Sequence, residues 1–229
     1  MPYIVLIAFV LVLVLVFGPS LWVRRVMAKY SQPADRYPGT GAELVEHLKG
    51  ILGLPNLAIE RTDSGDHYDP DAGAVRLTPD KHDGRSLTAI TVAAHEVGHA
   101  LQDRDGYAPL RWRSRLVRVT HVVERVGVGM MFGAPVLAAV TRIPATGLFA
   151  LAGGFLSLGS SVLVHLVTLP TEFDASFNRA LPILRDHILK PVDRRHAQRL
   201  LTAAALTYVA ASLVALLNVA RWWALLRRW

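Results

Sequence analysis

Five consecutive residues, His95-Glu96-Val97-Gly98-His99, combine side chains that can bind a metal ion and activate water. If this segment is helical, the two histidines lie one turn apart on one face, so both imidazoles can reach a single ion. Glu96 then lies about 100° around the helix from His95, where it can touch water at the metal without binding the metal. The motif is the H-E-x-x-H signature of zinc sites, and Glu96 has the position of a general base.

The residues around this motif favour a helix. Gly106 follows shortly after the expected helix end, and apolar residues recur at helical spacing at Ile90, Ala93, Ala94, Val97 and Leu101. Random placement in a chain of this composition gives roughly 0.01 matches to the motif. The alternative is a buried amphipathic helix whose histidines merely face solvent. We favour the metal site.

The composition restricts both the metal ligands and the partners. A chain of 229 residues allows one domain or two small ones, and 52% hydrophobic residues point to membrane spans. Without cysteine, any zinc must be held by histidine and carboxylate. The net charge of +7 comes from arginines that flank apolar runs, so the partner we expect is a lipid bilayer rather than a nucleic acid.

Three apolar regions predict about four transmembrane helices. Residues 1–23 read as an uncleaved anchor, 122–169 as a transmembrane hairpin broken at residues 141–144, and 200–229 as a last helix with a basic tail. Arg24, Arg25 and Lys29 follow the anchor, which places the next segment in the cytoplasm of a cell-membrane protein. If the last helix crosses, its arginines finish outside, so it could instead lie in the cytoplasmic interface.

Residues 24–121 have the composition of a soluble domain that contains the histidine motif. Thr40 and Glu43 form a T-x-x-E capping box, which predicts a helix over residues 41–52 that stops near Gly53. Two strands are expected, Leu57 to Arg61 and Ala74 to Thr78. The second could be an edge that binds an extended peptide, or the pair could be a structural hairpin.

A catalytic zinc site needs a third protein ligand on the same side of the membrane. Glu172 and Asp174 fit, because they follow directly after two predicted crossings, at the start of residues 170–199. His165 lies within a predicted span, and His121 and Glu124 at i and i+3 can pair with each other. Glu172 could alternatively pair with Arg179 without a metal.

Several motifs together resemble a known family. They are the N-terminal anchor, DHYDP at 66–70, VAAHEVGHALQD at 92–103, YAPLR at 107–111, TLPTEFDAS at 168–176 and AAALTYVAA at 203–211. In this order they resemble the neutral zinc metallopeptidases of membranes, the YugP-like family. A more distant similarity connects the chain to the CAAX prenyl proteases and the heat-shock protease HtpX.

The resemblance implies one zinc ion held by His95, His99 and Glu172, with Glu96 as the catalytic base. In the distant relatives a glutamate is followed three residues later by alanine and then usually by aspartate. Glu172 and Ala175 match, but Ser176 stands at the aspartate position, so Asp174 is considered as the residue that orients a ligand. The implied protein is mainly α, an integral membrane protein with about four transmembrane helices and a small zincin-like α+β cytoplasmic domain over residues 24–121.

The function expected from these features is hydrolysis of peptide bonds in a peptide or protein substrate, including membrane proteins. Stabilisation of the oxyanion requires a further donor, and the candidates are His67, Tyr68, Tyr208 and Arg179. An alternative is a membrane scaffold or chaperone-like protein with a structural metal, in which Glu96 has no task. A transporter is the third possibility, with Glu124 and His165 near or within the spans.

Overall fold

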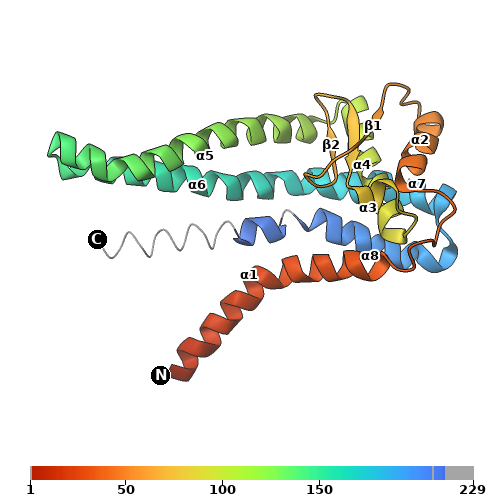
Figure 1. The fold of residues 1–229 in the computed structure, drawn as a ribbon, viewed down its shortest axis with the longest axis horizontal. Coiled ribbons are helices and arrows are strands. Elements are labelled where there is room, and N and C mark those ends of the chain that lie inside the picture. Colours follow the sequence, from red (N-terminus) through yellow and green to blue (C-terminus); the bar gives the residue numbers. More distant parts are fainter. Residues whose placement is uncertain (1, 208, 215–229) are drawn as a thin grey trace. The chain divides into compact units, whose positions relative to one another are not determined.

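The computed structural model describes residues 2–207 and 209–214. The described chain is mainly helical and contains one three-stranded sheet (Figure 1). It divides into two compact units. We call residues 1–20, 112–168 and 208–229 the hairpin unit, and Leu21–Arg111 with Leu169–Thr207 the histidine unit. Tyr208 and the basic tail fall outside the described residues.

Two long helices, α5 (Ala108–Thr141) and α6 (Pro144–Phe173), supply most of the hairpin unit. They approach closely where Gly127 meets Ser157, because a side chain at position 127 would overlap the serine hydroxyl. Many large apolar side chains of these helices are exposed, among them Phe132, Leu148 and Phe149. Exposed apolar surface of this kind is unusual for a soluble helix pair and suits a lipid environment.

Two helices in the described part of the chain are long and apolar enough to cross a membrane. They are Val10–Tyr30, within α1 (Pro2–Tyr30), and Pro191–Val214. Between them the described residues contain a shorter apolar helix, Ala145–Gly154. The arrangement with four spans therefore stays a prediction.

The first helix of the histidine unit that follows the anchor is α2 (Gly41–Leu52), with the predicted bounds. The Thr40 hydroxyl accepts from the Glu43 amide, and the Glu43 carboxylate accepts from the Thr40 amide. Gly53 ends the helix in the left-handed region, with φ 66°, where glycine carries no steric cost. The sequence therefore predicted both ends of α2 correctly.

The sheet contains β1 (Ala58–Arg61), β2 (His67–Asp69) and β3 (Ala74–Leu77), in the order β1-β3-β2. β3 pairs in parallel with β1 and antiparallel with β2. Both sides of β3 are thus occupied, so the prediction that Ala74 to Thr78 is a peptide-binding edge is wrong. The alternative of a β1–β3 hairpin is also wrong, because the unpredicted β2 turns back to pair with β3.

Helix α4 (Leu87–Arg104) is the centre of the histidine unit. Ser86 caps it, and every residue from Leu87 to Gln102 is buried. It packs against α2, against α8 (Arg194–Ala205) and, most extensively, against the π-helix η1 (Asp174–Ala180). The remaining short elements are α3 (Pro79–His82), α7 (Leu181–Ile183), η2 (Leu184–Ile188) and η3 (Pro191–Asp193). The histidine motif therefore lies on a helix that is enclosed by packing.

Candidate metal centre

His95 and His99 stand side by side on α4, as their spacing predicts. Both are 4% exposed, and their ring centroids are 4.8 Å apart in an edge-on arrangement. Burying two imidazoles without a polar partner would be costly, so the groups they face decide their role. The partner that both rings share is a carboxylate.

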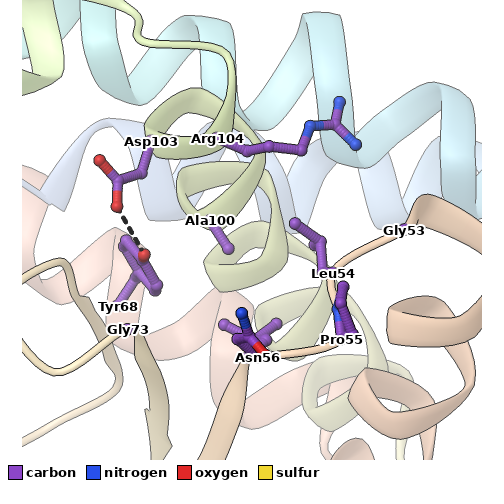
Figure 2. A pocket seen from close by; sticks show the side chains of 10 residues that line it. Gly53, Leu54, Pro55, Asn56, Tyr68, Gly73, Ala100, Asp103 and Arg104 are labelled. Atoms are coloured by element: carbon purple, nitrogen blue, oxygen red, sulfur yellow. Dashed lines mark hydrogen bonds between the residues drawn. The ribbon is translucent and has the colours of Figure 1, made fainter.

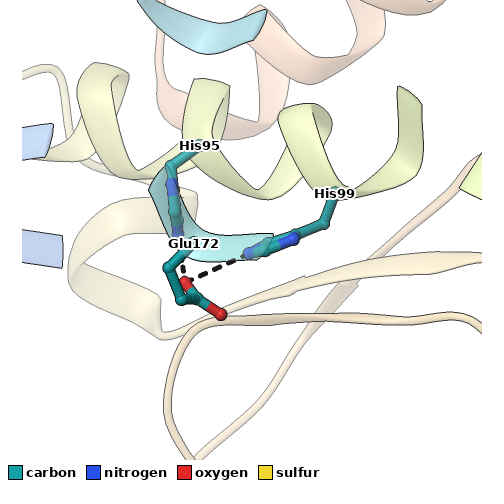
Figure 3. A group of neighbouring side chains, drawn as sticks. All are labelled: His95, His99 and Glu172. Carbon is teal, nitrogen blue, oxygen red and sulfur yellow. Dashed lines mark ion pairs between the residues drawn. The ribbon is translucent and has the colours of Figure 1, made fainter. Parts of the chain in front are cut away.

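That carboxylate belongs to Glu172, in the last turn of α6. Its Oε2 atom lies 3.3 Å from Nε2 of His95 and 3.4 Å from Nε2 of His99 (Figure 3). The three potential ligand atoms lie within 4.8 Å of one another, and Glu172 is 1% exposed. Two helices that are far apart in sequence thus converge on one point with two nitrogen donors and one oxygen donor.

A glycine allows this convergence. At Gly98 a Cβ atom would lie 2.6 Å from the Ala175 carbonyl oxygen, so only glycine lets α4 and η1 approach so closely. Ala175 is itself fully buried. Because Ala175 comes three residues after Glu172, this contact sets how near the carboxylate lies to the histidines. π-Helical turns such as η1 occur frequently at functional sites.

Hydrogen bonds fix the tautomer of His99. Gln102 donates through Nε2 to the Thr171 carbonyl and to Asp174 Oδ2, each at 2.8 Å. Its Oε1 must therefore face Nδ1 of His99, at 2.9 Å, as an acceptor. His99 then carries its proton on Nδ1, which leaves the Nε2 lone pair directed at the shared site.

Ser176 supplies the corresponding contact for His95. Its hydroxyl lies 3.1 Å from Nδ1 of His95 and can donate to the Leu201 carbonyl at 3.3 Å. In that arrangement the serine oxygen accepts the His95 Nδ1 proton, so Nε2 of this ring is also available as a ligand. The buried Ser176 is therefore the hydrogen-bond partner at Nδ1 of His95.

Asp174 lies one step further from His95, His99 and Glu172, which we call the metal group. Burial works to raise the pKa of its carboxyl group, but hydrogen bonds from Gln102, Arg179 and Asn178 outweigh burial and hold the pKa below its usual value. Arg179 donates to Asp174 at 2.8 Å and to Asp105 at 2.6 Å. Among the described residues the ion-pair partners of Arg179 are thus these two aspartates, whereas the metal-free alternative expects a pair with Glu172.

The other candidate ligands lie elsewhere in the described chain. His121 and Glu124 pair with each other at 3.9 Å on α5 in the hairpin unit, as the i,i+3 spacing predicts. His165 belongs to α6, within the hairpin unit. Among the described residues, the one group of histidines and carboxylates that could hold a metal is His95, His99 and Glu172.

Glu96 and the candidate oxyanion donors have different surroundings. Glu96 is buried on α4 at 6% exposure. His67 Nδ1 contacts the Gly65 carbonyl at 2.8 Å, while the Tyr68 hydroxyl donates to Asp103 at 2.8 Å. Burial and this hydrogen bond raise the pKa of Tyr68 above its usual value, so its hydroxyl stays protonated. Tyr208 lies outside the described residues.

The donor set fits a zinc ion. Zinc takes imidazole nitrogen and carboxylate oxygen, and catalytic sites have three protein ligands with one position open. Here two Nε2 atoms with available lone pairs and one carboxylate face a common point in a buried site. Hydrogen bonds at both Nδ1 atoms complete the usual environment of metal-binding histidines.

The metal-binding side chains of the site agree with the relationships of the whole chain. The chain belongs to the family described as "Putative neutral zinc metallopeptidase", whose sequence profile matches residues 4–227. It is similar to "Putative membrane protease YugP" of Bacillus subtilis (strain 168), with 34% identity over 219 residues, covering 93% of this chain and 94% of that protein. No solved structure gave a significant match. The family resemblance inferred from the motifs is confirmed.

Proposed function

We propose that this protein is a membrane zinc endopeptidase in which His95, His99 and Glu172 hold one zinc ion and Glu96 is the general base. The main observation behind this proposal is that three potential ligand atoms lie within 4.8 Å of one another in a buried site. The family supports zinc as the metal and a peptidase as the general class.

The number of ligands favours catalysis over a structural metal. A closed structural zinc site has four protein ligands, whereas three protein ligands leave a position for water or substrate. In the part of the chain that the structure describes, the group consists of three residues. A structural metal would also leave the buried Glu96 without a role, which is the main argument against the scaffold alternative.

The side chains around the site divide the chemistry among them. Zinc held by such a set polarises a carbonyl group and makes water more acidic. Glu96 accepts a proton from the attacking water and delivers it to the leaving amine, as a positioned carboxylate can. Gln102 and Ser176 keep the two imidazoles in the tautomer that presents Nε2 to the site.

The membrane setting is the second part of the proposal. Val10–Tyr30 has the length and apolar composition of a span, and Arg24, Arg25 and Lys29 gather at its C-terminal end. The positive-inside rule then orients the following histidine unit toward the cytoplasm. We therefore expect substrates that are peptides or membrane proteins at the cytoplasmic surface.

The test compares zinc content and proteolysis of detergent-purified wild type and Glu96→Gln. The substrates are an unfolded protein and a mixed peptide library. We expect about one zinc per chain in both forms and cleavage by the wild type alone, because the substitution removes the base and keeps all three ligands.

Two outcomes would contradict the proposal. A wild-type protein that binds no zinc rules out the metal centre. If both forms bind zinc and a measurable function of the protein persists in Glu96→Gln, the scaffold alternative explains the site better.

A further inference from the structure

A pocket of about 250 Å³ borders the C-terminal half of α4 in the histidine unit. Its floor is Ala100, the residue after His99, while Tyr68 and Asp103 line one side and Leu54 and Pro55 the other (Figure 2). This volume is smaller than that of a typical pocket for a drug-sized ligand, and it suits one long side chain.

The pocket contains one carboxylate, Asp103, that forms no ion pair with another described residue. Within the described residues Asp103 accepts a hydrogen bond from the Tyr68 hydroxyl and forms no ion pair. Arg104 also lines the pocket, but it donates hydrogen bonds to other groups, namely the Leu52 carbonyl at 2.6 Å and Asp105 at 2.8 Å. The charged group of the pocket that remains available to a ligand is therefore the Asp103 carboxylate.

The remaining walls are apolar. Leu54, Pro55, Leu57 and Ala100 provide the kind of surface against which the methylene stem of a lysine or arginine packs while its charged end reaches a polar group. Apolar walls with a carboxylate and a tyrosine on one side thus match a basic side chain. An acidic side chain would meet repulsion from Asp103.

The pocket is also close enough to the metal centre to bind a side chain of a peptide whose scissile bond lies at that centre. Asp103 comes four residues after His99, about 6 Å further along the axis of α4 and about 40° around it. Residues of an extended peptide are about 3.3–3.6 Å apart, so a side chain about two residues from the bond at the metal centre can reach the pocket. The pocket lies on the Glu96 side of the helix, since Ala100 follows Glu96 by one turn.

We propose that this pocket is a specificity subsite that binds a lysine or arginine side chain of the substrate, with Asp103 as the residue that selects it. The proposal rests on the proposed peptidase function and names its substrate class. Tyr68, which sequence motifs suggested as an oxyanion donor, is then a residue that orients Asp103.

The test measures binding, so that it does not depend on cleavage. Zinc-loaded, detergent-purified Glu96→Gln is titrated with fluorescent pools of ten-residue peptides that contain random neutral residues and one lysine. A matched pool has norleucine in place of lysine. We expect about tenfold tighter binding of the lysine pool, as for a charge-assisted hydrogen bond in a partly enclosed site.

A second substitution, added to the Glu96→Gln protein, shows which residue causes the preference for lysine. Asp103→Asn should abolish it, and Asp103→Lys should instead favour a glutamate pool over a glutamine pool. Asp63→Asn is the matched control, because it removes the same charge from an exposed loop residue outside the pocket. Equal zinc content of all forms shows that they are folded.

The inference is overturned if Glu96→Gln binds both pools equally, or if the lysine preference survives Asp103→Asn. Failure of the peptidase proposal is read separately, from the absence of cleavage by the wild type. The two results are independent, since a protein that does not cleave can still show or lack the lysine preference.

Discussion

At the residue scale, Gln102 ties together two parts of the metal group through one side-chain amide. It accepts from His99 and donates to the Thr171 carbonyl, next to Glu172 in the chain. A carboxylate often holds a metal-binding histidine directly, whereas here the amide stands between His99 and Asp174. Because Gln102 is fully buried, no water can easily replace these contacts.

Substituting Gln102 by alanine should therefore weaken zinc binding about 10- to 100-fold, the range found for partners of metal-binding histidines. The loss arises because His99 is no longer held in one tautomer and orientation. Competition with a chromophoric zinc chelator measures the affinity. Gln198→Ala, at an exposed position on α8, is the control and should leave the affinity unchanged. Unaltered affinity in Gln102→Ala would show that the network does not position the ligand.

At the scale of elements, the packing of α4 against η1 determines whether the histidines and Glu172 can meet. Gly98 and Ala175 are the point of closest approach, and neither has a side chain beyond Cβ. The geometry of the metal group therefore depends on the side-chain volume at position 98, although Gly98 contributes no ligand atom.

Gly98→Ala should force α4 and η1 apart, because the new Cβ would lie 2.6 Å from the Ala175 carbonyl oxygen. We expect destabilisation of about 1–3 kcal/mol from overpacking and a parallel loss of zinc affinity. Thermal unfolding in detergent and zinc titration measure the two effects. The matched control is Gly50→Ala on α2, where nothing lies within 4 Å and a helical alanine should stabilise slightly. Zinc affinity that equals that of the wild type would contradict this role of Gly98.

The sequence predicted those parts of the fold that depend on local chemistry. The bounds of α2 follow from its capping box and Gly53, and the histidine face of α4 follows from i,i+4 spacing. β2 was missed because His67–Asp69 lies among turn-forming residues and is a strand only through its pairing with β3. The same long-range pairing places β3 in the middle of the sheet.

The site was predictable to the extent that its ligands have metal-binding side chains. Gln102 could have been noticed from its i,i+3 spacing to His99, which brings the two side chains together on a helix. The Gly98 contact could not, because glycine in a helix has many causes and its partner Ala175 is far away in sequence. The use of Ser176 at the His95 ring likewise depends on the tertiary contact of α4 with η1.

At the scale of the whole molecule, a bound metal would join two segments that are separated in sequence by residues 112–168 of the hairpin unit. His95 and His99 precede α5, while Glu172 lies in the last turn of α6. A ligand that binds only the folded chain stabilises it, and at a free concentration 100 times its Kd the gain is about 2.7 kcal/mol. The site thus connects metal binding to the stability of the histidine unit.

Removal of zinc by a chelator should accordingly lower the unfolding temperature of the detergent-purified wild type, and added zinc should restore it. Glu172→Gln tests whether this effect comes from the proposed centre, because the amide keeps the shape of the side chain but is a much poorer zinc ligand. Its unfolding temperature should respond little to chelator or zinc. Glu124→Gln, which alters a carboxylate outside the metal group, should respond like the wild type. A zinc response of full size in Glu172→Gln would place the stabilising metal elsewhere and remove Glu172 from the ligand set.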